Sequence, residues 1–181
     1  MSARSSLFTL ARLIGLALAI AIACIDQAVK WLVTVPLGLD RAGAVIELLP
    51  FFDLTYTRNY GISLGMLEAT SMEMRWLLVA LTAGIALVVL VWMMREKLLG
   101  DILGLALILG GALGNIYDRY RHGYVIDYAD LHIGTFRPFL IFNIADAAIT
   151  IGVVVILARA LFFGEKGDDT QKDTSDPALE N

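Results

Sequence analysis

Two pairs of an asparagine and an aspartate, each three residues apart, and one further aspartate are the residues of this sequence best suited to acid–base chemistry. The pairs are Asn115 with Asp118 and Asn143 with Asp146, and Asp127 lies between them in the chain. Two carboxyl groups in a confined, poorly hydrated site share one proton, because both cannot ionise without a large cost. One can then deprotonate water while the other protonates a carbonyl oxygen or a leaving amine. Such a pair can hydrolyse a peptide bond without a covalent intermediate or a metal.

The same residues also fit a purely structural role, in which a buried hydrogen-bonded network joins two helices, and their spacing does not separate the two roles. Other catalytic arrangements fit less well. His122 and His132 lie in one predicted loop without an HExxH motif or a Cys/His set, so we expect no metal site and no cofactor. A nucleophilic pair of Ser63 and Lys30 rests on no motif.

Four long apolar segments must position these polar residues. The chain is 58% hydrophobic and only 18% charged, with a mean hydropathy of +0.72, whereas soluble proteins are about 25% charged. A helix needs about 20 mostly apolar residues to cross a bilayer. The predicted spans cover residues 11–35, 76–94, 98–115 and 139–163. The sequence therefore predicts one all-α integral membrane domain over residues 1–163.

Antiparallel packing of the third and fourth spans would bring the two Asn–Asp pairs to the same level of the membrane. Asp127 lies on the segment that joins these spans, so it can reach the same level. The third span is also rich in small residues, including Gly110, Gly111 and Gly114, which allow helix backbones to approach closely in lipid. We therefore expect its end to be held firmly against the fourth span.

Four other ionisable residues within the predicted spans need explaining, because such groups are costly in a membrane and often mark function. Asp26 and Lys30 are four residues apart on one helical face, so we expect them to pair. Asp101 and Arg159 lie near the opposite ends of their spans, from which they can extend to the headgroup region.

The two longer connections, residues 36–75 and 116–138, lie on the side of the membrane opposite both termini, because the number of spans is even. Alternation of polar and apolar residues predicts strands at 45–49 and 51–58, with a short third strand at 124–126. We expect a small β-sheet and loop on the membrane surface. Lys and Arg divide equally between the two sides, so the positive-inside rule does not orient the chain.

The net charge of −4 is that of the polar, acidic segment 164–181, which is predicted to be a disordered tail. The remaining chain has no basic patch, which argues against a nucleic-acid partner. Cys24 is the single cysteine, so no internal disulfide can form. The preceding residues 21–23 loosely resemble a lipoprotein cleavage site, but three more apolar segments follow instead of a soluble domain. We therefore expect Cys24 to be a packing residue.

Four stretches together resemble the signature blocks of the lipoprotein signal peptidase (signal peptidase II) family. They are DQAVK at 26–30, RNYG at 58–61 with Ser63, GGALGNIYDR at 110–119 continuing as GYVIDY at 123–128, and FNIAD at 142–146 with Gly152. Their order, their spacing and the four-span plan match over about residues 10–160, and the last two blocks are specific. Tyr128 replaces a frequent Phe, and residues 62–64 are less typical than an Ala-rich version. Neither departure touches the proposed chemistry.

The resemblance implies that Asp127 and Asp146 form a catalytic aspartyl dyad. It further implies that four residues help to position substrate, namely Asn59, Asn115, Arg119 and Asn143, while Asp26 and Asp118 support the architecture. The implied substrate is a bacterial prolipoprotein with diacylglycerol on its cysteine, cut just before that cysteine. The implied location is the bacterial cytoplasmic (inner) membrane with membrane lipid as surroundings, the termini in the cytoplasm and the dyad near the outer face. The implied inhibitor is the cyclic peptide globomycin.

Two other classes of protein fit the composition. In a small transporter, Asp146 and Asp26 would relay protons across the bilayer. A relay needs polar groups at all depths, whereas here they cluster near one interface and the span 76–94 carries no charge. A non-enzymatic scaffold would tolerate neutral replacement of Asp127 and Asp146.

Overall fold

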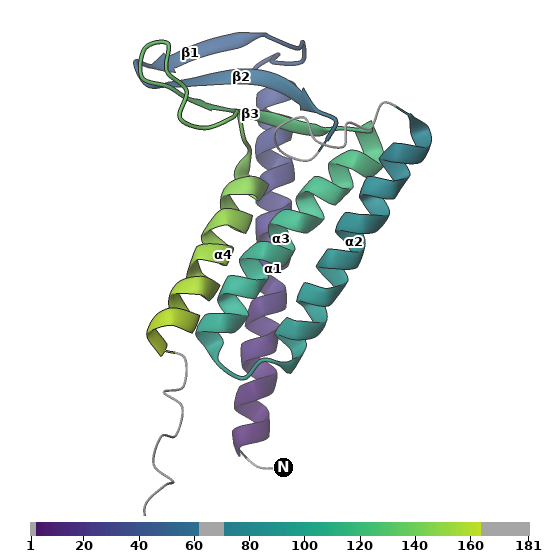
Figure 1. Cartoon of the computed structure of the whole chain (residues 1–181), viewed down its shortest axis with the longest axis vertical. Helices are drawn as coiled ribbons and strands as arrows, with labels where there is room; N and C mark the ends of the chain where they lie inside the picture. Colours follow the sequence, from purple (N-terminus) through teal and green to yellow (C-terminus); the bar gives the residue numbers. More distant parts are fainter. Residues whose placement is uncertain (1–2, 62–70, 164–181) are drawn as a thin grey trace, which may run out of the picture.

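Four long helices and a three-stranded sheet make up the computed structural model, which describes residues 3–61 and 71–163. The helices are α1 (Ala3–Thr34), α2 (Met72–Arg95), α3 (Leu99–His122) and α4 (Ile144–Phe163). Figure 1 shows the sheet covering one end of the helices, with the N-terminus and the end of α4 at the other. The predicted fold class, a four-span helical membrane protein with a small sheet, is confirmed. Ser63 and the predicted acidic tail, residues 164–181, lie outside the described residues.

Each helix is long and apolar enough to cross a bilayer. The candidate spans are Thr9–Thr34, Met72–Arg95, Leu99–His122 and Ile144–Phe162. The outer helices expose large apolar side chains. Examples are Leu77, Leu87 and Val88 on α2, and Val154 and Leu157 on α4. Large apolar groups exposed along whole helices indicate a membrane setting, where lipid is their solvent.

Several helix boundaries differ from the predicted spans, and those of α3 and α4 bear on the site. α1 begins at Ala3 and α2 at Met72, earlier than the predicted residues 11 and 76. α3 continues to His122 instead of ending at 115, so Asp118 and Arg119 are helical residues. These polar residues can stay in a buried helix because other elements provide their hydrogen-bond and ion-pair partners. α3 ends at Gly123, whose φ of 88° is the left-handed conformation typical of helix termini. α4 begins at Ile144, later than the predicted residue 139.

The sheet is antiparallel, with the order β1 (Val45–Leu49), β2 (Phe52–Asn59) and β3 (Val125–Leu131). Leu54 and Tyr56 of β2 are buried and pack with Val33 near the end of α1, so the sheet rests on this helix. β3 is longer than the predicted short strand, and Asp127 lies within it, opposite Thr57 of β2. Strand pairing therefore holds Asp127 in place where the sequence predicted a loop.

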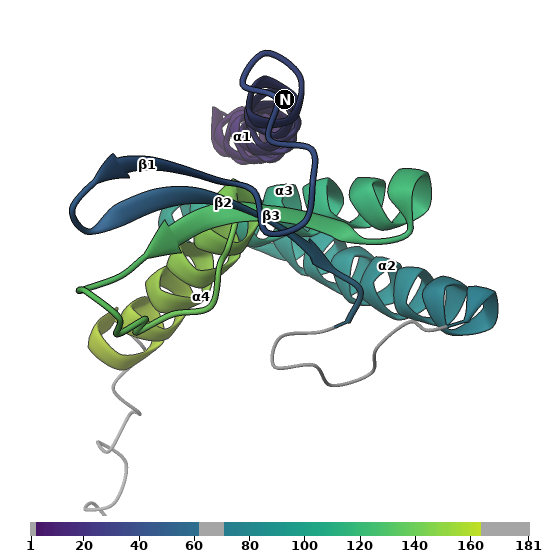
Figure 2. The ribbon, with the colours of Figure 1, turned by 90° about the horizontal axis from the view of Figure 1, so that it is seen from above.

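α3 is the central helix of the bundle. It packs against α1, α2 and α4, whereas α2 and α4 make no contact with each other within the described parts of the chain. Figure 2 shows α1 on one side of the sheet and α4 and α2 diverging on the other. Around α3 the core is formed mainly by Ile102, Leu105 and Ala106, which are fully buried, together with Met93 from α2.

A glycine allows the close approach of α3 and α4. A Cβ atom added to Gly111 would overlap with the backbone carbonyl oxygen of Ala145, in the first turn of α4. Backbone cannot move aside as a flexible side chain can, so any larger residue here must push the two helices apart.

Gly111→Ala is therefore expected to destabilise the protein by about 1–3 kcal/mol, the usual cost of overpacking. Gly84→Ala is the matched control, because a Cβ atom there would meet no atom within 4 Å and alanine favours the helix. Thermal unfolding of both variants in one detergent would measure the difference. An unfolding temperature for Gly111→Ala equal to that of Gly84→Ala would contradict the close α3–α4 contact.

Candidate active site

Asp127 and Asp146 lie near each other at the sheet end of the helices. Asp127 is on β3 and is only 2% exposed, whereas Asp146 is in the first turn of α4 and is half-buried. The sequence analysis expected both at one level of the membrane, and the structure brings both into contact with Asn143. The carboxyl groups thus differ in surroundings, one enclosed and one accessible.

Asn143 links the two aspartates. Its Nδ2 donates to Asp127 Oδ1 at 2.7 Å, and its Oδ1 accepts from the backbone N–H of Asp146 at 2.9 Å. In return, Asp146 Oδ2 accepts from the backbone N–H of Asn143 at 3.4 Å. This reciprocal pair is a capping box, which satisfies backbone donors at the start of α4. The three-residue spacing of Asn143 and Asp146 therefore positions Asp146 while it starts the helix.

Asn115 of α3 holds the other oxygen of Asp146. Its Nδ2 donates to Asp146 Oδ1 at 2.8 Å, and its Oδ1 accepts from Asn143 Nδ2 at 3.2 Å. Asn115 and Asn143 are both buried, so these bonds are shielded from water. The two amides predicted from the sequence thus join the two carboxyl groups in one network.

Asn59 and Arg119 approach the site from the end of β2 and from α3. Asn59 Nδ2 donates to Asp127 Oδ2 at 3.1 Å, so both oxygens of Asp127 accept a side-chain amide. Arg119 Nη2 donates to the carbonyl oxygen of Gly61 at 2.7 Å. Its Nε is buried and has no hydrogen-bond partner among the described residues. Asp118 does not form an ion pair with Arg119 in the described residues, although the two are adjacent.

Lys30 forms ion pairs with two further aspartates, which hold the backbone next to Asp146 and Asp127. Its Nζ lies 2.8 Å from Asp26 Oδ2 and 2.7 Å from Asp118 Oδ2. Asp26 Oδ1 accepts the backbone N–H of Ala145, the neighbour of Asp146, at 3.1 Å. Asp118 Oδ2 accepts the backbone N–H of Ile126, next to Asp127, at 3.1 Å.

This triad of Lys30, Asp26 and Asp118 is buried, and Gln27 adds a bond to Asp118 Oδ1 at 2.9 Å. The expected pairing of Asp26 with Lys30 is confirmed. Because one carboxylate holds the backbone beside Asp146 and the other holds the backbone beside Asp127, one ammonium group stabilises both halves of the candidate site.

The pKa of Asp127 is raised from its ordinary value of 3.8 to about 7. Burial is the main cause, because it disfavours the charged carboxylate, and the nearby charge of Asp146 adds to it. The hydrogen bonds from Asn59 and Asn143 and the charge of Lys30 act in the opposite direction. Asp127 therefore retains its proton up to about neutral pH.

The remaining charged residues of the spans lie elsewhere. Asp101, in the first turn of α3, pairs with Arg159 near the end of α4, and Arg159 Nε is 2.5 Å from Asp101 Oδ1. This pair lies at the end of the helices opposite the sheet. The described side chains thus place one ion pair at one end and the Asp–Asn–Lys network at the other, which does not form the continuous path that a proton relay requires. Cys24 lies within the unbroken helix α1 and is exposed.

Comparison with known proteins relates this geometry to a family. Residues 18–162 match the family model described as Signal peptidase (SPase) II. The chain belongs to this family. Signal peptidase II proteins are peptidases, so the chain is identified as a hydrolase of peptide bonds, and the resemblance seen in its sequence is confirmed.

Relatives of the signal peptidase II family match most of the chain. A lipoprotein signal peptidase of Sphingopyxis alaskensis is 58% identical over 152 residues, which cover 84% of this chain and 87% of the relative. One of Rhizorhabdus wittichii is 50% identical over 157 residues, covering 87% and 91%. A bacterial membrane enzyme solved by the in meso method at 2.3 Å resolution shares the fold, with a TM-score of 0.73, 27% identity and coverage of 90% and 94%.

Sequence reasoning missed two features of this candidate site. Lys30 was expected to pair with Asp26 alone, because its contact with Asp118 depends on the packing of α1 against α3. Gln27 was not singled out, although it lies in the DQAVK block, and this position was the available signal.

Proposed function

We propose that the chain is an aspartic endopeptidase that removes the signal peptide from diacylglyceryl-modified bacterial prolipoproteins, with Asp127 and Asp146 as its dyad. The observation that carries this proposal is the position of Asn143, which donates to Asp127 and caps the helical turn that bears Asp146. Two carboxyl groups that accept hydrogen bonds from one residue, one group enclosed and one accessible, are suited to sharing a proton.

In the proposed reaction, the carboxylate of Asp146 takes a proton from water, and the resulting hydroxide attacks the carbonyl carbon of the scissile bond. Asp127 donates its proton to the carbonyl oxygen, which yields a neutral gem-diol. Asp146 then gives its proton to the leaving amine as the C–N bond breaks, and Asp127 recovers a proton from the diol. The burial that raises the pKa of Asp127 supports its role as the acid.

Asn59, Asn115 and Asn143 hold the dyad, and we propose that these groups and Arg119 also align the substrate backbone. Arg119 suits this role because its Nε has no partner among the described residues and the charge of Asp146 acts on its guanidinium. Asp26 and Asp118 support the architecture through Lys30. The lack of contact between α2 and α4 supports a lateral approach of the apolar signal peptide from the bilayer.

The location follows the same proposal. The chain would lie in the bacterial inner membrane, with its termini in the cytoplasm and the dyad near the outer face, where lipid-modified precursors present their cleavage site. Asp127 on β3 and Asp146 in the first turn of α4 lie at the sheet end of the helices, a position consistent with access to both lipid and water. Globomycin is expected to inhibit the enzyme by occupying this site.

The experiment is to incubate the purified chain with a diacylglyceryl prolipoprotein and to determine the product mass. We expect cleavage just before the lipidated cysteine, inhibition by globomycin and no loss of activity with a chelator. The same precursor with its cysteine changed to serine cannot be lipidated, and it should remain uncut. Failure of the well-folded chain to cut the lipidated precursor would refute the proposal.

The proposal predicts that cleavage slows as the pH rises through about 7, because Asp127 loses the proton that it donates. The measurement is kcat/KM between pH 5 and 9 in one lipid mixture. Asn59→Ala should shift the decline to higher pH, because the hydrogen bond from Asn59 lowers the pKa of Asp127. A rate that increases through pH 7 would exclude Asp127 as the acid.

The carboxyl group of Asp127 should also make the protein less stable as the pH rises. Because the pKa of Asp127 is higher in the folded protein than in the unfolded chain, the folded state binds this proton more tightly. Its contribution to the free energy of unfolding is complete below about pH 4 and is lost as the pH rises to about 7. In a background of Asp127→Asn, this part of the pH dependence should disappear.

A further inference from the structure

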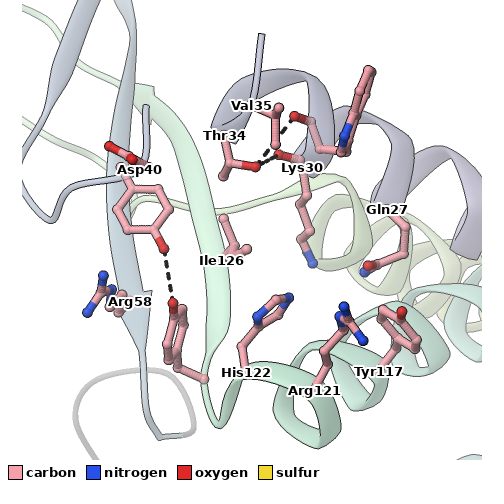
Figure 3. A pocket seen from close by; sticks show the side chains of 13 residues that line it. Gln27, Lys30, Thr34, Val35, Asp40, Arg58, Tyr117, Arg121, His122 and Ile126 are labelled. Carbon is pink, nitrogen blue, oxygen red and sulfur yellow. Dashed lines mark hydrogen bonds between the residues drawn. The ribbon is translucent and has the colours of Figure 1, made fainter. Parts of the chain in front are cut away.

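A cavity of about 600 Å³ lies at the sheet end of the helices and is not lined by Asp127 or Asp146. We call it the interfacial cavity, and its lining includes Lys30, Trp31, Arg58, Tyr117, Arg121 and His122. Figure 3 shows Arg121 and His122 extending from the end of α3 toward Lys30 and Gln27 of α1. Trp31 and Tyr117 are exposed, as aromatic side chains often are at the membrane–water boundary.

The cavity has cationic groups that are available to a ligand. Arg121 is exposed and makes no hydrogen bond or ion pair with any described residue. Arg58 is also exposed, and its guanidinium lies 5.1 Å from the ring centre of Tyr124. Lys30, by contrast, is already neutralised by Asp26 and Asp118. Among the described residues of the lining, the one acid is Asp40, which is exposed and lies 3.9 Å from Arg41.

An apolar groove of about 510 Å³ lies next to the interfacial cavity. It runs between α1, α2 and α3, and Gln27 and Tyr117 line both spaces. The rest of its lining includes Ala23, Cys24, Val79, Leu113 and Ile116. Since shared residues border both spaces, one elongated ligand can extend from the cavity into the groove.

The order of residues along α3 matches the two halves of an amphiphile. Leu113, Tyr117 and Arg121 are four residues apart, so they lie on one face of the helix. At 1.5 Å per residue, Leu113 is about 12 Å below Arg121. This distance is close to the depth of one leaflet of acyl chains, about 15 Å, half of a 30 Å hydrocarbon core.

We propose that the interfacial cavity and the apolar groove together bind one anionic phospholipid. Arg121, His122 and Arg58 contact its phosphate, and one acyl chain lies in the groove beside Cys24 and Leu113. Guanidinium groups suit phosphate, and basic pockets between membrane helices select anionic headgroups. The diacylglycerol of a prolipoprotein carries no phosphate, so the charge of the cavity favours a phospholipid as the occupant. The site is separate from the dyad, and its binding does not depend on the proposed function.

The test is native mass spectrometry of the full chain equilibrated with equal amounts of phosphatidylglycerol and phosphatidylcholine. The wild-type protein should retain more phosphatidylglycerol than phosphatidylcholine. Arg121→Gln should reduce this preference about five-fold, the effect of one basic side chain near the membrane surface, and adding His122→Gln should reduce it further. Arg95→Gln removes an exposed arginine from the last turn of α2 and should change nothing.

A second variant tests the groove independently of charge. Cys24→Trp should fill the groove and reduce retention of both lipids without a change in the preference between them, because Cys24 is exposed and lines it. Asp127→Asn should bind lipid as wild type does, which separates this site from the proposed catalysis. An unchanged preference in Arg121→Gln, or displacement of the phospholipid by added prolipoprotein, would overturn the inference.

Discussion

Asp127→Asn and Asp146→Asn are each expected to reduce prolipoprotein cleavage by roughly 10²–10⁴-fold, the usual contribution of a positioned acid or base. Asparagine retains the size of the side chain but cannot transfer the proton. Because the two carboxyl groups act as one unit, the double variant should be hardly slower than either single variant. The measurement is single-turnover cleavage of a diacylglyceryl precursor by each purified variant.

Glu47→Gln is the matched control for these replacements, because Glu47 is exposed on β1, away from the dyad. It should cleave as wild type does. Circular dichroism and size-exclusion chromatography would show that all variants are folded. Near-normal turnover by either folded dyad variant would refute the aspartic mechanism and favour the scaffold alternative, which tolerates such changes.

Lys30→Met is expected to destabilise the protein by about 3–5 kcal/mol and to abolish cleavage in consequence. Removing one partner of a buried ion pair leaves uncompensated charge, here the carboxylates of Asp26 and Asp118. These carboxylates hold the backbone beside Asp146 and Asp127, so the loss should reach both halves of the dyad. Thermal unfolding and cleavage, measured on one preparation, test this prediction.

Two further variants test whether the unpaired buried charges cause the loss of stability. Lys97→Met changes an exposed lysine and should leave stability unaltered. Lys30→Met combined with Asp26→Asn and Asp118→Asn removes the unpaired charges and should recover much of the stability. A Lys30→Met protein as stable as wild type would contradict the role of the triad.

The helices and strands were predictable because their signals are local. An apolar run of about 20 residues identifies a span, and alternation around Leu54 and Tyr56 identifies β2. The end of α3 was not predictable in this way. Residues 116–122 are polar enough to indicate a loop, but they remain helical because Asp118 and Arg119 find partners on α1 and at Gly61.

The candidate site was partly predictable. The spacing of Asn143 and Asp146 indicated a shared helix face, and the resemblance to signal peptidase II indicated Asp127 as the second acid, although the roles of all these residues remain predictions. Of the triad of Lys30, Asp26 and Asp118, the sequence predicted only the pair of Asp26 and Lys30. Its third member comes from another helix, so no spacing within α1 reveals it. The raised pKa of Asp127 also depends on burial by distant segments.

The capping box of α4 has a consequence for how the enzyme matures in the cell. Asp146 lies in the last span, and its position depends on Asn143, on Asn115 of α3 and, through Ala145, on Asp26 of α1. A nascent chain with three inserted spans therefore lacks Asp146, half of the proposed dyad, and a fourth span that has not docked holds this residue out of place. Under the proposed mechanism, proteolytic competence would then arise only at the final assembly step.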